Sequence, residues 1–447
     1  MKRLATAAPW LAASLGVAIT LWVFYPGYMS WDSAFQWWQM RHALYDPAHP
    51  PVMAGLWSLT DRVLPGPGGY FAYQTLLYWC ALAALMSALR LPPILRCLCV
   101  LLLGFWPPIW GLSAQLWKDV AMMSWFAVSV ALLCRDLATP SRALRLLALL
   151  TLALACAYRY NAIVAALPLA LWLGWREMSL RYGAPASRLL SAMIGGVFLA
   201  AVALLATVPA RVLHVASVPI WPTIAQWDIA AVSIAENHLL YPPHWSAPDL
   251  SVPELRAAFD PAVNTTIFAT GKVYVNLYTP MTDADFSALR DTWISLPLQH
   301  REAYLRHRWR VTQLLLGWDR AAHPDGLVFS AGEVAFKDNP PVLRNASGAN
   351  ARVQEQLQSL IATPLFAGWM YLLLALAVFV GASFDRQRPG AGLAMAVAAS
   401  ALLLVLPLTI FAPSTDFRYL SWLLLAAPVS LLIWFTAGTR AAKSRPR

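Results

Sequence analysis

The chain has 447 residues, of which 59% are hydrophobic and only 12% are charged. This composition excludes an ordinary soluble globular protein and indicates a polytopic membrane protein, with the lipid bilayer as its main partner. The formal net charge is +11, which the positive-inside rule explains, so we expect no nucleic-acid partner.

A helix of about 20 apolar residues crosses the hydrocarbon core of a bilayer. By this measure we expect an all-α bundle of ten membrane-spanning helices. They cover residues 8–25, 70–89, 94–110, 119–134, 144–158, 161–175, 189–209, 361–381, 391–411 and 419–437. The chain would thus have an N-terminal membrane module of seven spans, residues 1–209, and a C-terminal membrane module of three spans, residues 361–447.

The short connections between these spans alternate in charge. Those on one side hold little besides basic residues, which lie at 2–3, 90–96, 135–145, 176–188, 386–388 and 440–447. The positive-inside rule places this side in the cytoplasm. We therefore expect a multi-pass protein of a bacterial inner membrane, with both termini in the cytoplasm.

Residues 210–360 are too long and too polar for a simple connection. They contain many prolines and helical patches near 224–239, 283–292 and 296–315. Long domains cross a membrane regardless of their charge. We therefore predict a mainly helical periplasmic domain between the seventh and eighth spans.

Polar side chains gather where spans end on the outer side. Ionisable groups at this depth are costly, and they usually face a water-filled cavity or a partner. Singly, each has a structural explanation: Asp32 as a helix cap, His49 as a turn residue and Arg159 as a snorkelling cation. Their shared side indicates a site, and the candidates are Asp32, His49, Lys118, Asp119, Arg159, Asn161, Asp228, Asp416, Arg418 and Tyr419.

Such a set of groups suits an anionic lipid phosphate and a hydroxyl acceptor. Arginine binds phosphate oxygens as a fork, and lysine binds them as a point charge. A carboxylate would take the proton of the acceptor as the phosphate departs. Because phosphate leaves readily, a general acid is less necessary than in glycoside hydrolysis.

These motifs resemble the GT-C class of integral-membrane glycosyltransferases, in particular relatives of the protein mannosyltransferases and aminoarabinose transferases. The matching elements are Asp32 soon after the first span, His49-Pro50-Pro51, Lys118-Asp119, Arg159-Tyr160-Asn161 and Asp416-Phe417-Arg418-Tyr419. The resemblance implies a GT-C-like bundle that transfers a sugar from a polyprenyl-phosphate donor to a glycan, lipid or protein acceptor at the outer face of the membrane.

The resemblance also implies roles for individual residues. Asp32, as the acid of the first outer loop (residues 26–69), would be the catalytic base, and His49 would orient the donor or the acceptor. By position and type, the cations would bind the donor phosphate, and they are Lys118, Arg159 and Arg418. Supporting roles fall to Asp119, Asn161, Asp228, Asp416 and Tyr419.

No cofactor is expected with certainty. Some relatives carry two consecutive acids in the first outer loop and use a divalent metal, whereas Trp31 and Ser33 flank Asp32 here. A metal is therefore not favoured, although Asp32, His49 and Asp228 would provide suitable ligands if they converged.

Three other functions stay open. A transporter or flippase of lipid-linked sugars usually has internal repeats and helices broken near the midplane, and no repeat is visible here. A polymerase or ligase of lipid-linked glycans would need similar cations. A non-catalytic scaffold would have a flat outer face instead of a cavity. The sugar, the acceptor, the stereochemical outcome and the oligomeric state are not specified by these residues.

Overall fold

The computed structural model describes residues 2–45, 49–183, 187–215, 218–276, 278–319, 334–342 and 345–437. These residues form helices and isolated β-bridges, and none of them belongs to a β-strand. The helices are α1 (Lys2–Phe24), α2 (Trp31–His42), α3 (Val52–Asp61), α4 (Pro67–Ala88), α5 (Pro93–Gly104), α6 (Pro107–Ser113), α7 (Lys118–Ala138), α8 (Arg142–Tyr158), η1 (Tyr160–Ala162), α9 (Ile163–Tyr182), α10 (Arg188–Ala206), α11 (Val208–Val212), α12 (Trp221–Glu236), α13 (Val252–Ala258), η2 (Asn264–Thr270), α14 (Asp283–Gln299), α15 (Arg301–Leu316), α16 (Gly348–Ile361), η4 (Pro364–Phe366), α17 (Gly368–Phe384), α18 (Ala391–Val405), α19 (Leu408–Phe411), η5 (Phe417–Leu420) and α20 (Ser421–Thr436).

Seven of the described helical segments are long and apolar enough to cross a membrane. They are Ala7–Phe24, Pro67–Ala88, Lys118–Ala138, Tyr160–Tyr182, Arg188–Val212, Ala391–Phe411 and Phe417–Thr436. The all-helical prediction is therefore confirmed for the described residues, and these helices indicate a multi-pass membrane protein. The predicted total of ten spans is not confirmed.

The three remaining predicted spans differ from a single long helix. The run at 94–110 forms two helices, α5 and α6, bent by 64°, because Pro107 and Pro108 lack the N–H groups that would continue α5. The helices α8 and α17 have only 17 residues each. Helix α17 begins at Gly368 and not near 361, since the short η4 turn separates it from α16.

The helices form two compact units by their internal contacts. The first unit comprises Met1–Val215, Val328–Leu404 and Arg418–Arg447, and the second comprises Ala216–Leu327 and Val405–Phe417. The second unit is therefore shorter at its C-terminal side than the predicted domain of residues 210–360, and it includes α19 from the C-terminal part of the chain.

The boundary differs from the prediction because residues 334–342 contact α2 of the first unit. Asp338 accepts a hydrogen bond of 2.8 Å from Trp38 Nε1 and lies 2.9 Å from His42 Nε2. Asn339 Nδ2 donates to the Ala34 carbonyl at 2.7 Å. These polar contacts join residues about 300 positions apart in sequence. A local sequence pattern therefore does not predict them.

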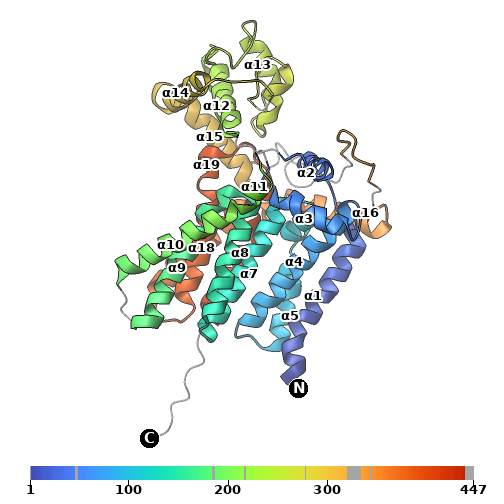
Figure 1. Ribbon diagram of the computed structural model, residues 1–447, viewed down its shortest axis with the longest axis vertical. Helices are drawn as coiled ribbons and strands as arrows, with labels where there is room; N and C mark the ends of the chain where they lie inside the picture. Colours follow the sequence, from blue (N-terminus) through green and yellow to red (C-terminus); the bar gives the residue numbers. More distant parts are fainter. Residues whose placement is uncertain are drawn as a thin grey trace. The chain divides into compact units, whose positions relative to one another are not determined.

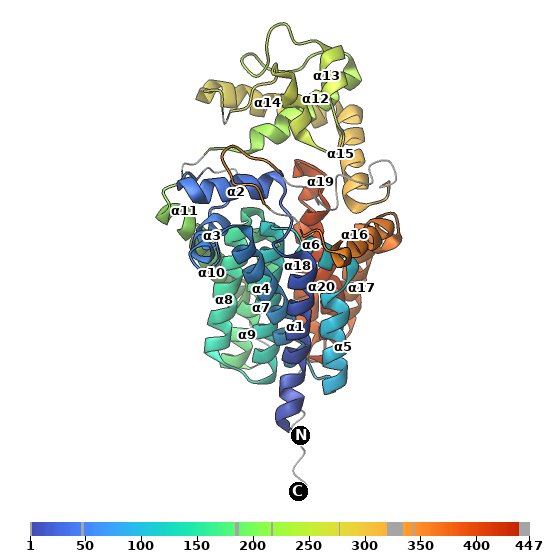
Figure 2. The same ribbon diagram turned by 90° about the vertical axis from the view of Figure 1, so that its right-hand side faces the viewer.

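In the first unit, α1, α4, α7 and α8 lie side by side in one bundle (Figure 1). Both views show α2, α3 and α16 across one end of this bundle, and α1 begins at the other end (Figure 2). Helices α9 and α10 approach closely, because a Cβ atom on Gly174 would overlap the backbone of Gly195. Small residues allow such close contact between membrane helices. The end covered by α2 and α3 contains the charged residues discussed below.

At its C-terminal end, α7 contributes a buried carboxylate to an ion-pair network. Asp136 lies 2.8 Å from Arg145 Nη1 and 3.0 Å from Arg176 Nε, and Arg145 Nε lies 2.9 Å from Glu177. At 1.5 Å of rise per residue, this network is roughly 27 Å along α7 from Lys118. The network joins α7, α8 and α9. The sequence predicted little besides basic residues at these helix ends, and it did not predict that Asp136 and Glu177 pair with them.

The second unit has its own hydrophobic core between α12, α14 and α15. Ile229, Val232, Trp245 and Leu289 are fully buried in it. The indole Nε1 of Trp245 donates to the Asp285 carbonyl at 2.9 Å, which satisfies its one polar atom. The second unit thus has the hydrophobic core of its own that is expected of a domain.

Candidate functional site

The loop between α1 and α2 is joined to the start of α7 by backbone hydrogen bonds. The Tyr28 N–H donates to the Ala114 carbonyl at 2.9 Å, and the Leu116 N–H donates to the Tyr28 carbonyl at 3.0 Å. These bonds form a short parallel bridge between Tyr28 and Gln115. The loop that precedes Asp32 is thereby held beside the residues that precede Lys118.

The first turn of α2 is attached to the same segment. Ser30 is the N-cap of α2 and forms a reciprocal capping box with Ser33. Ser33 Oγ also donates to the Leu116 carbonyl at 2.7 Å, and Trp117 Nε1 donates to Ser30 Oγ at 2.8 Å. Asp32 lies within this turn, where the helix dipole favours a negative charge.

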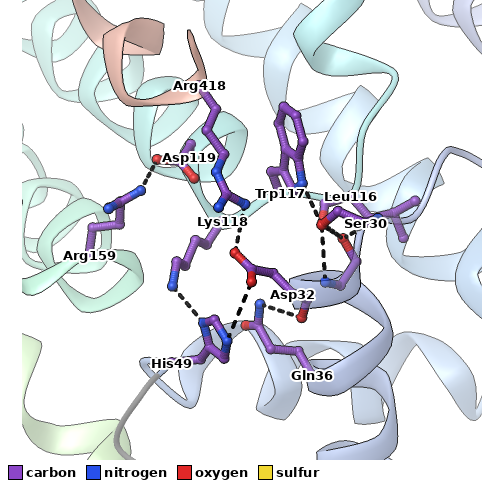
Figure 3. Close-up of polar contacts among 11 residues, drawn as sticks. Ser30, Asp32, Gln36, His49, Leu116, Trp117, Lys118, Asp119, Arg159 and Arg418 are labelled. Carbon is purple, nitrogen blue, oxygen red and sulfur yellow. Dashed lines mark hydrogen bonds and ion pairs between the residues drawn. The ribbon is translucent and has the colours of Figure 1, made fainter. Parts of the chain in front are cut away.

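Asp32, His49, Lys118 and Arg418 converge on one another (Figure 3). Asp32 Oδ2 lies 2.7 Å from Arg418 Nη1, and Asp32 Oδ1 lies 3.9 Å from His49 Nε2. Lys118 Nζ lies 2.7 Å from His49 Nδ1. Because an ammonium group only donates, His49 Nδ1 accepts, and the His49 proton is therefore on Nε2, which faces Asp32.

A second ion pair lies beside this group of four. Arg159 Nη1 is paired with Asp119 Oδ1, and Arg159 Nε donates to Asn161 Oδ1 at 3.3 Å. The Arg159 guanidinium lies 4.5 Å from the Tyr419 ring centroid, and the Arg418 guanidinium lies 5.6 Å from the same ring. Tyr419 thus contacts both arginines. We call the eight residues the charged cluster: Asp32, His49, Lys118, Asp119, Arg159, Asn161, Arg418 and Tyr419.

The charged cluster has one surplus positive charge near neutral pH. It contains three cations and two carboxylates, and Arg418 and Arg159 each pair with a carboxylate. Lys118 instead contacts the neutral ring of His49. An added anion would therefore be attracted most strongly to Lys118.

Burial and charge act in opposite directions on Asp32. Burial would raise the pKa of its carboxyl group, but the adjacent Arg418 guanidinium, with a smaller contribution from Lys118, holds that pKa below its usual range. The Asp32 side chain keeps 25% of its surface exposed. It is thus an ionised carboxylate that solvent reaches, and its basicity is low while Arg418 is its partner.

Burial, followed by the positive charge of Lys118, lowers the pKa of His49 to about 3. An unfolded histidine titrates near pH 6.5. Between these two values the folded chain binds fewer protons than the unfolded chain, so its stability falls as the pH is lowered. At pH 5 this effect of His49 amounts to about 2 kcal/mol.

The substitution His49→Asn is expected to reduce this acid sensitivity. The variant should lose less thermal stability between pH 7 and pH 5 than the native chain does, because its residue 49 does not titrate. Thermal unfolding of the full chain in detergent at the two pH values measures this difference. The control is His238→Asn, which replaces an exposed histidine just after α12. If the stability of His49→Asn depends on pH as strongly as that of the native chain, the expectation is contradicted.

Gly27 sets the geometry of the loop before α2. Its φ angle is +95°, and a Cβ atom there would overlap the side chains of Leu116 and Phe71. Gly27→Ala is therefore expected to destabilise the fold by about 2 kcal/mol or more, from the strained φ angle and the overlap together.

A matched control separates these two causes. Gly66 has a similar φ angle of +88°, but a Cβ atom there meets nothing within 4 Å. Gly66→Ala should therefore cost only the backbone strain. If thermal unfolding shows equal losses for the two variants, contact with Leu116 and Phe71 does not matter at Gly27.

Two predicted site residues lie in the second unit. Asp228 of α12 is fully buried, and its carboxylate lies 2.6 Å from Arg308 Nη2 and 3.1 Å from His307 Nε2. Trp293 Nε1 donates to the same carboxylate at 2.6 Å. The contacts of Asp228 are thus with the core of the second unit and not with the charged cluster.

Asp416 is the other predicted residue in the second unit. The two residues before it are held by backbone contacts: Ser414 bridges to Val263, and the Thr415 N–H donates to the Ala262 carbonyl at 2.8 Å. The chain enters the first unit at Arg418, two residues after Asp416.

The described residues offer no ligand set for a metal. None of their His, Cys, Asp and Glu side chains forms a group of three or more that could hold an ion. His49 and Asp32 are 3.9 Å apart, but Asp228, the third ligand considered from the sequence, belongs to the second unit.

The structure adds residues that the sequence did not single out. Trp117 lies under Arg418, with its ring centroid 5.0 Å from the guanidinium. Ser30 and Ser33 fix the turn that contains Asp32. A serine three residues before another serine at a helix start is the capping signal that would have identified them.

A cavity lies beside the turn that contains Asp32. It has a volume of about 320 Å³, and its lining includes Gly27, Tyr28, Met29 and residues of the 334–342 segment. Its lining residues do not include Asp32 or the cations of the charged cluster. This open space lies next to the loop before α2.

No protein-family model matches this chain, and neither the curated proteins nor the solved structures include a match to it. The resemblance to the GT-C class therefore has no independent support from these comparisons. A functional proposal rests on the residues of the chain and their geometry.

Proposed function

We propose that this chain is a membrane glycosyltransferase that moves a sugar from a polyprenyl-phosphate donor to a hydroxyl group of a glycan, lipid or protein. The observation that carries this proposal is the convergence of Asp32, His49, Lys118 and Arg418 at one end of the bundle. A carboxylate suited to accept a proton thereby lies among cations suited to bind phosphate. The apolar helices beneath it would hold a lipid-linked donor in the bilayer.

The Asp32–Arg418 pair suggests how the base becomes active. Arg418 lowers the basicity of Asp32. A donor phosphate would compete with Asp32 for the Arg418 guanidinium, which matches two phosphate oxygens at once. Binding of the donor would therefore raise the pKa of Asp32 at the moment when a base is needed.

In the transfer step, the acceptor oxygen forms a bond to the anomeric carbon while the bond from that carbon to the phosphate oxygen breaks. The electron pair of the broken bond leaves with polyprenyl phosphate, whose added negative charge Lys118 and Arg418 stabilise. The acceptor proton passes to the Asp32 carboxylate. His49, with its proton on Nε2, would donate a hydrogen bond toward the acceptor or the sugar.

We place this reaction at the outer face of a bacterial inner membrane. Support comes from the excess of arginine over acidic residues in the connections at 135–145 and 176–188. The second unit would then be periplasmic, and both termini would be cytoplasmic.

A transporter of lipid-linked sugars is the second candidate. The 64° bend between α5 and α6 favours it, because broken helices often line transport sites. The charged cluster favours the enzyme, since its carboxylate and cations lie together at helix ends rather than at the middle of a span.

Reconstitution of the full chain with synthetic polyprenyl-phosphate sugars tests the two candidates. Mass spectrometry would follow the release of polyprenyl phosphate in the presence of envelope extract as the acceptor source. A transferase releases it in a manner that requires Asp32. Movement of a fluorescent donor across liposomes, with no release of polyprenyl phosphate, would instead establish transport.

Lys118→Gln is expected to weaken donor binding. It removes the surplus charge that contacts neutral His49, and a hydrogen bond to a charged group contributes about 1.5–3 kcal/mol. The donor KM should therefore rise by about 10-fold to 100-fold. Lys118→Arg, which keeps the charge, should restore part of the affinity, and an unchanged KM in Lys118→Gln would remove Lys118 from the phosphate site.

A further inference from the structure

The exposed large apolar residues of the second unit are concentrated on α14, α15 and α19. On α15 and just beyond it, Leu305, Trp309 and Trp318 keep 51%, 54% and 49% of their surfaces exposed. The rings of Trp309 and Trp318 contact each other with centroids 5.4 Å apart. Further exposed members are Ile294, Leu298, Leu406, Ile410 and Phe411. The contact between Trp309 and Trp318 makes part of this surface contiguous, and contiguous exposed apolar groups indicate a binding partner.

Helix α15 has two different faces. Its buried face contains Ala303, Tyr304 and Val311, which pack inside the second unit. Its exposed face presents Leu305 and Trp309, four residues apart and therefore neighbours on the helix surface. Arginines accompany this face at positions 301, 306 and 310. The pair of Arg306 with Glu302 is exposed and that of Arg310 with Asp319 is partly exposed, and such ion pairs contribute little to stability.

A contact inside the second unit joins α15 to the last residues of an apolar segment of membrane-spanning length. Helix α15 packs against α19, and Arg308 Nη1 donates to the Ala412 carbonyl at 3.0 Å, directly after α19. The residues of α19 form the end of the apolar segment Ala391–Phe411, which is long enough to cross a membrane. A helix that contacts the end of a span lies near the level of the phospholipid headgroups.

We propose that the exposed face of α15, with Leu305, Trp309 and Trp318, binds the phospholipid headgroup layer of the bilayer. Tryptophan prefers this layer, since its ring is apolar and its N–H needs a polar partner. The arginines at 301, 306 and 310 bind lipid phosphates, as guanidinium groups do elsewhere. This surface holds the second unit against the membrane, and it functions whether or not the chain transfers sugars.

Depth-dependent fluorescence quenching of the full chain in nanodiscs tests this binding. Trp309→Cys would be labelled with an environment-sensitive fluorophore in a background in which Cys80, Cys97 and Cys99 are replaced by serine. Tyr278→Cys is the matched control, because Tyr278 is 79% exposed and lies in the same unit but outside α15. Size-exclusion chromatography would establish that both labelled chains are folded.

The label at position 309 is expected to emit at shorter wavelength than the label at 278. It should lose about half or more of its emission when a nitroxide is attached to the lipid headgroup, and less when the nitroxide is deep in the acyl chain. A label at 309 that is as water-exposed as the control overturns the proposal. The proposal is also overturned if the label at 309 is shielded from water but is quenched by neither nitroxide lipid, because that result shows contact with protein.

Discussion

Replacing Asp32 by asparagine is expected to lower the rate of sugar transfer by about 10²–10⁴-fold, the contribution typical of a positioned general base. Asparagine keeps the size of the side chain but cannot accept the acceptor proton. The variant should still fold, because the capping of α2 depends on Ser30 and Ser33 and not on Asp32. Turnover of a polyprenyl-phosphate sugar by the reconstituted chain measures the effect.

The affinity for the donor separates catalysis from positioning. If Asp32 is the base, kcat falls and donor binding is unchanged or tighter, since Arg418 loses its partner at 2.7 Å. If Asp32 only positions Arg418, the donor KM rises and kcat changes little. Asp385→Asn is the control, because the Asp385 side chain is 37% exposed and pairs with Arg388, outside the charged cluster. Near-normal turnover by Asp32→Asn would exclude the base assignment.

Asp228→Asn is expected to lower the free energy of unfolding by about 3–5 kcal/mol, because it leaves Arg308 buried without a countercharge. The Arg308 side chain is only 5% exposed, and Asp228 Oδ2 lies 2.6 Å from it. Burial also lowers the pKa of His307, whose ring contacts the same carboxylate, and an imidazole ring cannot supply the negative charge that Arg308 loses. We therefore assign Asp228 to the stability of the second unit.

Thermal unfolding together with hydrogen exchange in α12 and α15 would measure this loss. Asp291→Asn is the matched control, because the Asp291 side chain is 67% exposed and pairs only with its neighbour Arg290. Exposed pairs of this kind contribute little. A stable Asp228→Asn variant that has lost transfer activity would instead favour the supporting role in the site that the sequence predicted for Asp228.

The membrane helices were predictable because their signal is local. A run of apolar residues identifies a span without knowledge of its neighbours, and the segments at 119–134, 161–175 and 189–209 fall within membrane-length helical segments of the structure. Span boundaries were less predictable. The bend between α5 and α6 depends on how the chain continues after Pro107 and Pro108, and the length of α17 depends on the turn that ends at Ala367.

The candidate site was predictable only in part, for the same reason. The ends of the spans drew attention to Asp32, Lys118, Arg159 and Arg418, because charged groups near a bilayer are costly wherever they occur. The pairing of these residues was not predictable. Arg418 and Asp32 are nearly 400 positions apart. Asp119 pairs with Arg159 and not with Lys118, the cation next to it in the sequence.

The sequence by itself thus determined the class of protein, the positions of most helices and the side chains that are costly to place in a membrane. Each of these follows from hydrophobicity and charge within about 20 residues. Only the tertiary structure decided that Asp32 contacts Arg418 and His49, and that Asp228 belongs to the core of the second unit. Such contacts depend on how distant helix ends pack, and packing is a property of the whole fold.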